Sequence, residues 1–491
     1  MPVSVIRKDI IFQPDSSRVI ALFLSNNDLR KVAVVKRVLS LSEKQQRETL
    51  VQILRDYSKR HRSISRVFEK NFNKLEHIFR QMNIESEQLS TVQKVLIGSY
   101  FTMEYSIESA AFFNPSIVED FDQSGLEKGE KRVVISFRAT GEGHVSSIVF
   151  RRGILDKDNN LRMMRIGDSI EKAEVLHKMM FNKKRILSKL TEMHTLDIYS
   201  SIMDDLPDVF EYSVLKDLLK KELAKPDISK EKKEAFEEIL WLMNSFYDIQ
   251  FKHDSDISER VIFPISDSES RGIEDARFVR FTDDDGSESI MGTYTAYNGH
   301  AILPKLITTE DFYTFRVMPL YGEGSLGKGM ALFPKKIKGK YAMLGRMDGV
   351  NNYLMYSLKT NEWKNPQLIQ KPEYAWEYTQ VGNCGSPLWT EKGWLVITHG
   401  VGAMRRYCIG ASLFDLEDPS IEIGRLSEPL LTPLEEEREG YVPNVVYSCG
   451  SIIHNNTLIL PYAVSDYSST YATVDLTELL EALMDSKQIK L

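Results

Sequence analysis

Cysteine, excess positive charge and long apolar runs are all scarce in this 491-residue chain. The three cysteines, Cys384, Cys408 and Cys449, show neither zinc-site spacing nor a disulfide framework, which indicates a reducing compartment and no metal site. A net charge of −7 argues against a nucleic-acid or membrane-surface partner. The N-terminus lacks the apolar core of a signal peptide, and no run is long enough to span a bilayer. These absences predict a cytoplasmic globular protein.

The N-terminal part, residues 1–105, is expected to form a mostly helical accessory region, because apolar residues recur at helical spacing from about residue 27 to residue 80. Between Asp28 and Arg80 there are fourteen Lys and Arg against six Asp and Glu, an excess of eight positive charges in an acidic protein. A solvated helix face is the simplest interpretation of this excess. A homo-oligomer contact or an anionic partner is the alternative.

Further along, the chain repeats a unit of two apolar strands joined by a polar turn. Five copies can be aligned, and their second strands are 132–140, 290–298, 341–346, 394–400 and 458–463. From the second copy onward the spacing is that of a propeller blade. The pattern therefore predicts a mainly β fold, a five-bladed β-propeller over residues 106–480, followed by a C-terminal tail over 481–491. The long gap after the first copy predicts a helical insertion at about 165–252.

In a propeller the inner strands converge on a central axis, so residues at equivalent strand ends can share one cavity. The ends of the second strands carry Arg138, Tyr297, Arg346, His399 and Tyr462. We expect these five side chains to line a common site.

The stretch Gly272–Phe278 places two carboxylates, Glu274 and Asp275, next to Arg277 at the start of the second copy. A salt bridge at a strand edge is the simplest explanation for such a cluster. A carboxylic acid surrounded by cations also suits a glycoside phosphorylase, because phosphate is already nucleophilic and needs no catalytic base. Arg, Lys and His side chains would hold that phosphate.

Four motifs in order along the chain resemble glycoside hydrolase family 130, which comprises β-mannoside phosphorylases and related β-mannosidases: GIEDAR (272–277), ALFPKKI (331–337), GWLVITHGV (393–401) and GYVPNVVY (440–447). The resemblance implies a five-bladed propeller and inversion at the anomeric carbon. It implies that Asp275 is the general acid, acting through a sugar hydroxyl. It also implies a phosphate site drawn from Arg138, Lys328, Arg346, His399 and one of Arg405 and Arg406.

Sugar recognition needs planar hydrogen-bonding groups and aromatic surfaces, which several strand ends supply. The candidates for substrate binding are Glu274, Arg277, Tyr297, Asn298, Asp348, Asn383 and Tyr462. We expect a β-mannoside and inorganic phosphate as partners, with no cofactor. Two departures from the family pattern, Gly327-Lys328-Gly329 and Pro461–Asp466, bear on the acceptor sugar and on phosphate use.

Two other functions fit the same sequence. An inverting β-mannosidase would need a carboxylate base, for which Glu142, Glu269 and Glu274 are the candidates. A non-catalytic glycan-binding propeller would use the cavity for recognition only.

Overall fold

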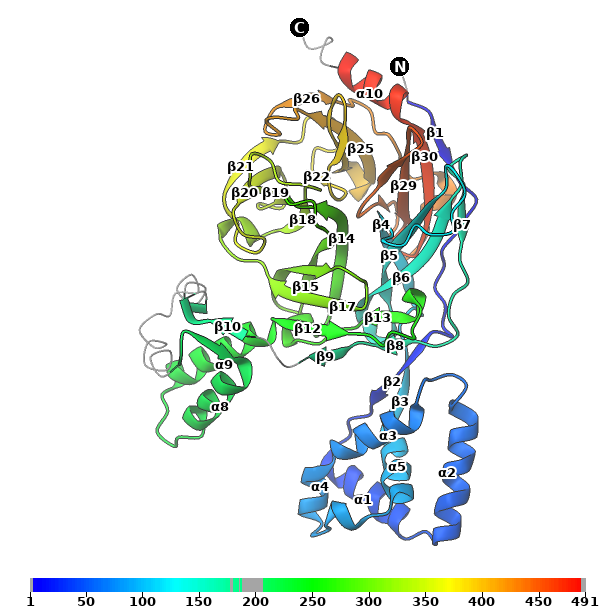
Figure 1. Ribbon diagram of the computed structural model, residues 1–491, viewed down its shortest axis with the longest axis vertical. Coiled ribbons are helices and arrows are strands. Elements are labelled where there is room, and N and C mark those ends of the chain that lie inside the picture. Colours follow the sequence, from blue (N-terminus) through cyan, green and yellow to red (C-terminus); the bar gives the residue numbers. More distant parts are fainter. Residues whose placement is uncertain (1–2, 177–179, 185, 188–205, 487–491) are drawn as a thin grey trace.

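The computed structural model describes residues 3–176, 180–184, 186–187 and 206–486, and the chain is mainly β. Most strands belong to a large β body, and a helical unit formed by the N-terminal region lies at one end of it (Figure 1). No helix in the described part of the chain combines the length and the apolar character needed to cross a membrane.

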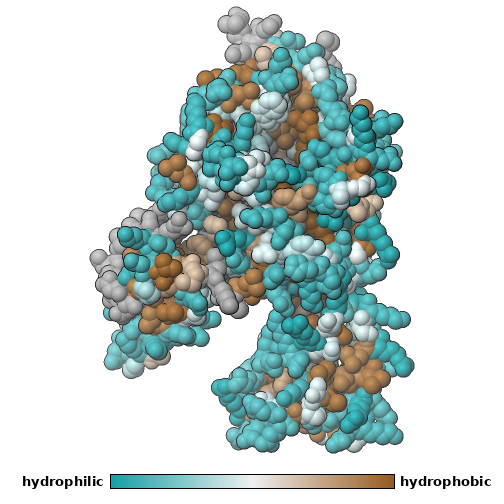
Figure 2. Space-filling view, viewed as in Figure 1, coloured by the Kyte–Doolittle hydropathy of each residue, from teal (hydrophilic) through white to brown (hydrophobic). Residues whose placement is uncertain are grey.

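Five helices form the N-terminal unit: α1 (Asp28–Leu39), α2 (Glu43–Tyr57), α3 (Ile64–Asn73), α4 (Glu76–Gln81) and α5 (Thr91–Tyr100). Ser42 and Ser90 begin α2 and α5 with capping boxes, in which Gln45 and Gln93 return the hydrogen bond to the cap. An antiparallel pair, β2 (Val19–Phe23) and β3 (Thr102–Ser106), connects this unit to the β body. Figure 2 shows the helical unit as a separate lobe with some apolar side chains on its surface.

The β body contains five antiparallel groups of strands. The first two are β4 (Ala111–Glu119), β5 (Lys131–Thr140), β6 (Ser146–Leu155) and β7 (Leu161–Met163), then β14 (Gly272–Thr282), β15 (Glu288–Tyr297), β16 (Ile302–Thr309) and β17 (Thr314–Pro319). The third is β18 (Lys328–Leu332), β19 (Tyr341–Arg346), β20 (Asn352–Ser357) and β21 (Lys364–Gln370). The predicted pairs of strands are therefore the first two strands of each group.

The fourth and fifth groups differ because their first strand is split. The fourth contains β22 (Gln380–Asn383), β23 (Leu388–Thr390), β24 (Gly393–Val401), β25 (Tyr407–Phe414) and β26 (Glu422–Arg425). The fifth contains β27 (Val446–Tyr447), β28 (Ile452–His454), β29 (Thr457–Val464), β30 (Ser468–Asp475) and β1 (Val5–Arg7). The N-terminal strand β1 thus completes the last group, so the first residues of the chain belong to the β body and not to the helical region predicted for 1–105.

In its described part, the insertion predicted as helical contains the helices α8 (Tyr212–Leu223) and α9 (Lys230–Asn244) and also several short strands. Of these strands, β9 (Glu174–Leu176) and β12 (Tyr247–Gln250) extend the second group beyond β17, and β8 (Glu171–Lys172) pairs with β13 (Arg260–Ile262). A further pair is β10 (Met180–Asn182) with β11 (Val209–Glu211). In β12, buried Tyr247 and Ile249 alternate with half-buried neighbours, a strand period that the helical prediction overlooked. Residues 177–179, 185 and 188–205 of the predicted insertion lie outside the described residues.

Helix α10 (Leu476–Asp485) runs through the boundary at which the sequence predicted a tail to begin. Its buried Leu479 and Leu483 pack in the apolar core of the last two groups. The C-terminal segment is therefore part of the fold at least to residue 485.

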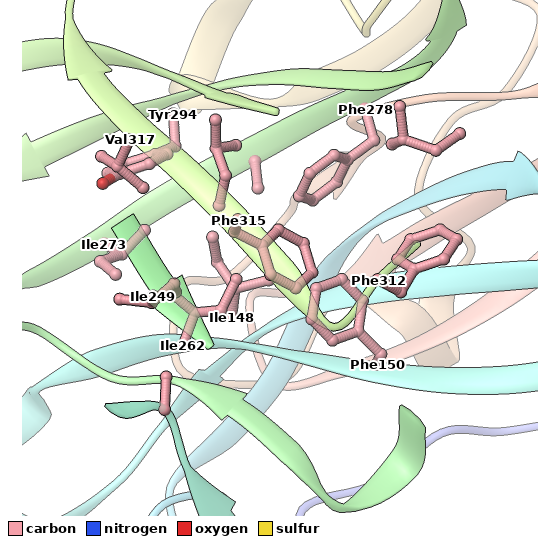
Figure 3. Close-up of a cluster of buried hydrophobic side chains, with 14 of the residues drawn as sticks. Ile148, Phe150, Ile249, Ile262, Ile273, Phe278, Tyr294, Phe312, Phe315 and Val317 are labelled. Atoms are coloured by element: carbon pink, nitrogen blue, oxygen red, sulfur yellow. The ribbon is translucent and has the colours of Figure 1, made fainter. Parts of the chain in front are cut away.

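An apolar core joins the first two groups where β6 meets β14 (Figure 3). Phe150 and Phe315 stack there with ring centroids 6.0 Å apart, and Phe278 lies against Phe150. This packing fixes β14, which carries the stretch of interest, against the first group.

Candidate active site

Asp275 lies in a β-bulge of β14. The pairing of β14 with β15 is regular up to Glu274 and resumes at Arg277, so Asp275 and Ala276 together stand opposite the single residue Tyr294. Asp275 has φ of 53°, a left-handed conformation that is costly for a residue with a Cβ atom. Bulges re-aim side chains next to active sites, and this one turns a carboxylate out of the sheet.

The first strands of two other groups are interrupted at the equivalent point. The register of β4 shifts between Phe113 and Ser116, where Asn114 has φ of 50°. The register of β18 shifts between Lys328 and Ala331, where Gly329 has φ of 73°. The bulge is therefore a repeated feature of the inner strands.

These bulges bring charged groups from three strand groups together. Asp275 Oδ1 accepts hydrogen bonds from Asn114 Nδ2 at 2.7 Å and from Arg138 Nη1 at 3.3 Å. Arg138 Nη2 donates to Glu274 Oε1 at 3.1 Å, and Lys328 Nζ donates to Glu274 Oε2 at 3.0 Å. The Arg138 guanidinium also lies over the ring of Phe113 at 5.0 Å. Predicted site residues Asp275, Glu274, Arg138 and Lys328 thus form one cluster.

The Asp275 side chain is 25% exposed, and the protein around it disfavours its charged form. The positive charges of Arg138 and Arg277 outweigh that effect and hold the pKa of Asp275 below its usual value. Arg277 also fixes the backbone here, because its Nη1 donates to the Asp275 carbonyl at 2.9 Å and its Nη2 donates to the Tyr447 hydroxyl at 2.6 Å. Asp275 is accordingly a carboxylate when nothing is bound, and buried Arg277 supports it.

Asp466, which the sequence analysis did not select, lies beside this cluster. Burial and the negative charge of Asp275 raise the pKa of Asp466 to about 6, although Arg138 and Arg405 act in the opposite direction. Asp466 has φ of 50° in the turn after β29. The available signal was its position just beyond the second strand of the last copy, where the prediction stopped at Tyr462. Exposed Arg405 is close enough to influence Asp466 and so belongs to the same region.

Arg346 and His399 form a second, adjoining pair. His399 is buried, and burial together with the charges of Arg346 and Arg277 lowers the pKa of His399 well below its usual value. In the neutral tautomer that satisfies both ring nitrogens, Nδ1–H donates to the Asn383 carbonyl at 3.1 Å and Nε2 accepts from Arg346 Nη1 at 2.9 Å. His399 therefore positions Arg346 and carries no positive charge of its own, unlike the cationic ligand expected from the sequence.

Four predicted substrate-binding residues hold turns or neighbouring strands together. Buried Asn383 donates from Nδ2 to the Gly329 carbonyl at 2.7 Å and so fixes the bulge beside Lys328. Asn298 and Tyr297 shape the turn after β15, where Asn298 Oδ1 accepts two backbone N–H groups and the Tyr297 hydroxyl donates to the Gly299 carbonyl. Asp348 accepts hydrogen bonds within its own turn, and these lower its pKa to about 2 despite partial burial.

Tyr462 is not brought into the cluster. It is fully buried, and its hydroxyl donates to Glu437 Oε1 at 2.8 Å. The neighbouring residue, Ala463, pairs with Tyr447, which contacts Arg277 and His399. A shift of one residue along a strand moves a side chain to the opposite face, which explains why Tyr462 points into the core.

The three carboxylates considered as a hydrolytic base differ in their surroundings. Glu269 is fully buried, and its Oε1 accepts from Lys305 at 2.7 Å and from the Tyr247 and Tyr294 hydroxyls at 2.6 Å each. Glu274 is paired with two cations, as described above. Glu142 is exposed on a short turn. Burial removes Glu269 from solvent, and the ion pairs occupy Glu274.

The sequence comparisons with known proteins all give β-mannoside phosphorylases. A sequence profile of glycoside hydrolase family 130, described as β-1,4-mannooligosaccharide phosphorylase, matches residues 233–485. The chain is 39% identical over 154 residues to a 1,2-β-oligomannan phosphorylase of Thermoanaerobacter sp. (strain X514), covering 31% of this chain and 52% of the relative. It is 29% identical over 233 residues to a β-1,2-mannobiose phosphorylase of Listeria innocua, covering 45% of this chain and 63% of the relative. The matches thus span between half and two thirds of these relatives' own lengths.

Among solved structures, the β-1,2-mannobiose phosphorylase of Listeria innocua in complex with β-1,2-mannobiose aligns with a TM-score of 0.45 at 22% identity, covering 76% of this chain and 92% of the other. The family profile covers more than half of the sequence and contains Asp275, Lys328, Arg346 and Asp466. The chain therefore belongs to glycoside hydrolase family 130.

Proposed function

We propose that this protein is an inverting phosphorylase that cleaves β-mannosides with inorganic phosphate and releases α-mannose 1-phosphate. The observation that carries the proposal is the cluster in which Arg138 and Lys328 surround the paired carboxylates of Glu274 and Asp275. Family membership and the names of the matched curated relatives, which are β-mannoside phosphorylases, support it.

In this reaction a phosphate oxygen forms a bond to the anomeric carbon while the bond from that carbon to the glycosidic oxygen breaks on the opposite face. The leaving oxygen takes a proton from Asp275, directly or through a sugar hydroxyl. Arg138, Lys328 and Arg346 are the proposed phosphate ligands, and Arg405 lies at the edge of the same region. The substrate roles of Glu274 and Arg277, and those of Tyr297, Asn298, Asp348, Asn383 and Tyr462, remain predictions.

A proton donor must be protonated, whereas nearby cations keep free Asp275 ionised. A phosphate dianion bound to Arg138 would offset part of that positive charge, so the pKa of Asp275 should rise when phosphate binds. This coupling favours proton transfer only when the nucleophile is in place. It also disfavours hydrolysis, because water brings no such charge.

The same proposal includes a five-bladed propeller. Five antiparallel groups, each with an interrupted first strand, and the closure of the last group by β1 support it. A cytoplasmic location is supported by Cys384, Cys408 and Cys449, which are free and buried.

An assay for mannose 1-phosphate tests the function. The panel consists of β-1,2-mannobiose, β-1,4-mannooligosaccharides and 4-O-β-D-mannosyl-D-glucose, the linkages in the names of the family and its relatives. We expect mannose 1-phosphate from at least one of them, and only when phosphate is present. Release of free mannose at the same rate without phosphate would identify a hydrolase instead.

Asp466 gives a prediction about pH. Because its pKa is about 6, it should lose its negative charge as the pH falls through that value. Sulfate, which stays a dianion over this range, should therefore bind the wild type more tightly below that pKa than above it. In Asp466→Asn the affinity should be high throughout, as measured by calorimetry on both sides of the transition. Asp285→Asn, in the exposed turn between β14 and β15, is the matched control, and an unchanged pH dependence in Asp466→Asn would contradict the assignment.

A further inference from the structure

A second cluster of positive charge lies away from the active site, between the helical unit and the β body. A pocket of about 600 Å³ opens there between β2, helix α3, and the strands β8 and β9. Its lining includes Arg66 and Lys70 of α3, Lys74 just after that helix, and Lys172 of β8. Residues distant in the sequence therefore bring four cations to one concave site.

Among the described residues, no carboxylate pairs with any of these four cations. No ion pair joins Arg66, Lys70, Lys74 or Lys172 to an acid within 4.0 Å in the described part of the chain. Of the other charged lining residues, Arg62 pairs with Glu259, which is not part of the lining, at 2.7 Å, and Lys252 contacts Glu171 at 3.8 Å. Glu174 is the remaining acid of the lining, so positive charge is in excess.

The cations also crowd one another. Protein atoms around the Lys172 ammonium, together with the charges of Lys74 and Lys70, lower the pKa of Lys172 to about 8. The Lys172 ammonium lies 4.9 Å above the ring of Phe263, and that of Lys74 lies 4.9 Å above the ring of Phe23. The negative end of the helix dipole explains the placement of Lys70 and Lys74 at the C-terminus of α3. It does not explain Lys172, which is on a strand.

We propose that this pocket binds a small molecule that carries two or more phosphate groups. Several ammonium groups and a guanidinium converging on a concave site are the recognition chemistry of a multivalent phosphate, and a bound anion would relieve their mutual repulsion. The pocket is concave and shared by two parts of the fold, which favours a compact ligand over the extended surface of a nucleic acid or a membrane. A ligand held there would connect the helical unit to the β body.

Calorimetry with inorganic tripolyphosphate tests the proposal. The full-length chain carries Arg138→Gln as a background, which weakens anion binding at the active site. On that background, two triple variants are compared. The pocket variant carries Lys70→Gln, Lys74→Gln and Lys172→Gln. The control carries Lys220→Gln, Lys221→Gln and Lys232→Gln, which remove the same charge from exposed positions of α8 and α9. Circular dichroism verifies that both are folded.

We expect one saturable site per chain in the background and in the control. In the pocket variant the dissociation constant should be at least tenfold higher. Tripolyphosphate should also raise the melting temperature of the background and the control but not that of the pocket variant, because a ligand that binds only the folded state stabilises it. Equal binding by the pocket variant and the control, or no saturable binding to the background, would overturn the proposal. Neither outcome depends on turnover of a mannoside.

Discussion

Asp275→Asn should lower kcat for phosphorolysis by about 10²- to 10⁴-fold, the usual contribution of a positioned acid. The amide keeps the shape of the side chain and can still contact Asn114 and Arg138, but it cannot donate an acidic proton. Production of mannose 1-phosphate from the best substrate of the panel measures the loss. The affinity for sulfate should not weaken, because a negative charge has been removed from an anion site.

Asp283→Asn is the matched control for this experiment. Asp283 lies in the turn of the same hairpin, where it pairs with Lys336. Its replacement should leave kcat within a few-fold of the wild type. If Asp275→Asn kept activity comparable to that of the control, Asp275 would not be the proton donor. If neither the wild type nor Asp275→Asn turned over a mannoside and both bound sugar equally well, the protein would be a non-catalytic binding propeller.

The sequence predicted the β repeat for a physical reason, whereas the role of Asp275 came from the resemblance to family 130 and stays a prediction. Apolar strands and polar turns are local patterns, and the paired strands of each copy are close in the chain. The later strands of each group and the pairing of β1 with β30 were not predicted, since β1 and β30 join opposite ends of the chain. Local periodicity contains no information about such a partner.

The site was only partly predictable because its geometry depends on bulges. Asn114 lies within β4, yet its left-handed conformation brings its amide to Asp275, which a strand pattern in the sequence does not reveal. A bulge changes which residues face the site without changing the apolar pattern. An uncertainty of one residue placed Tyr462 at the site. Asp466 was left out because it lies in the turn two residues beyond β29, outside the predicted strand. Charge states were equally hidden, since only the contacts of His399 reveal that it is neutral.

Arg138→Gln should lower kcat at saturating mannoside by about 10²- to 10³-fold, the range found when a preorganised donor to a reacting oxygen is removed, and should raise KM for phosphate. Arg138 contacts both Asp275 and Glu274, so its removal weakens phosphate binding and leaves the two adjacent carboxylates with less compensating positive charge. Because Arg138 is the largest influence lowering the pKa of Asp275, that pKa should rise in the variant. Carbon-13 NMR of labelled aspartate follows the change.

Arg280→Gln provides the control, because Arg280 is on the same strand β14 but pairs with Glu119 and Glu288. It should alter neither KM for phosphate nor the pKa of Asp275. The pKa of Asp275 and KM for phosphate together separate two explanations of a slow Arg138→Gln enzyme. A raised pKa with a raised KM means that Arg138 both binds phosphate and sets the charge of the acid, whereas an unchanged KM would show that phosphate binds elsewhere and would contradict the proposed site.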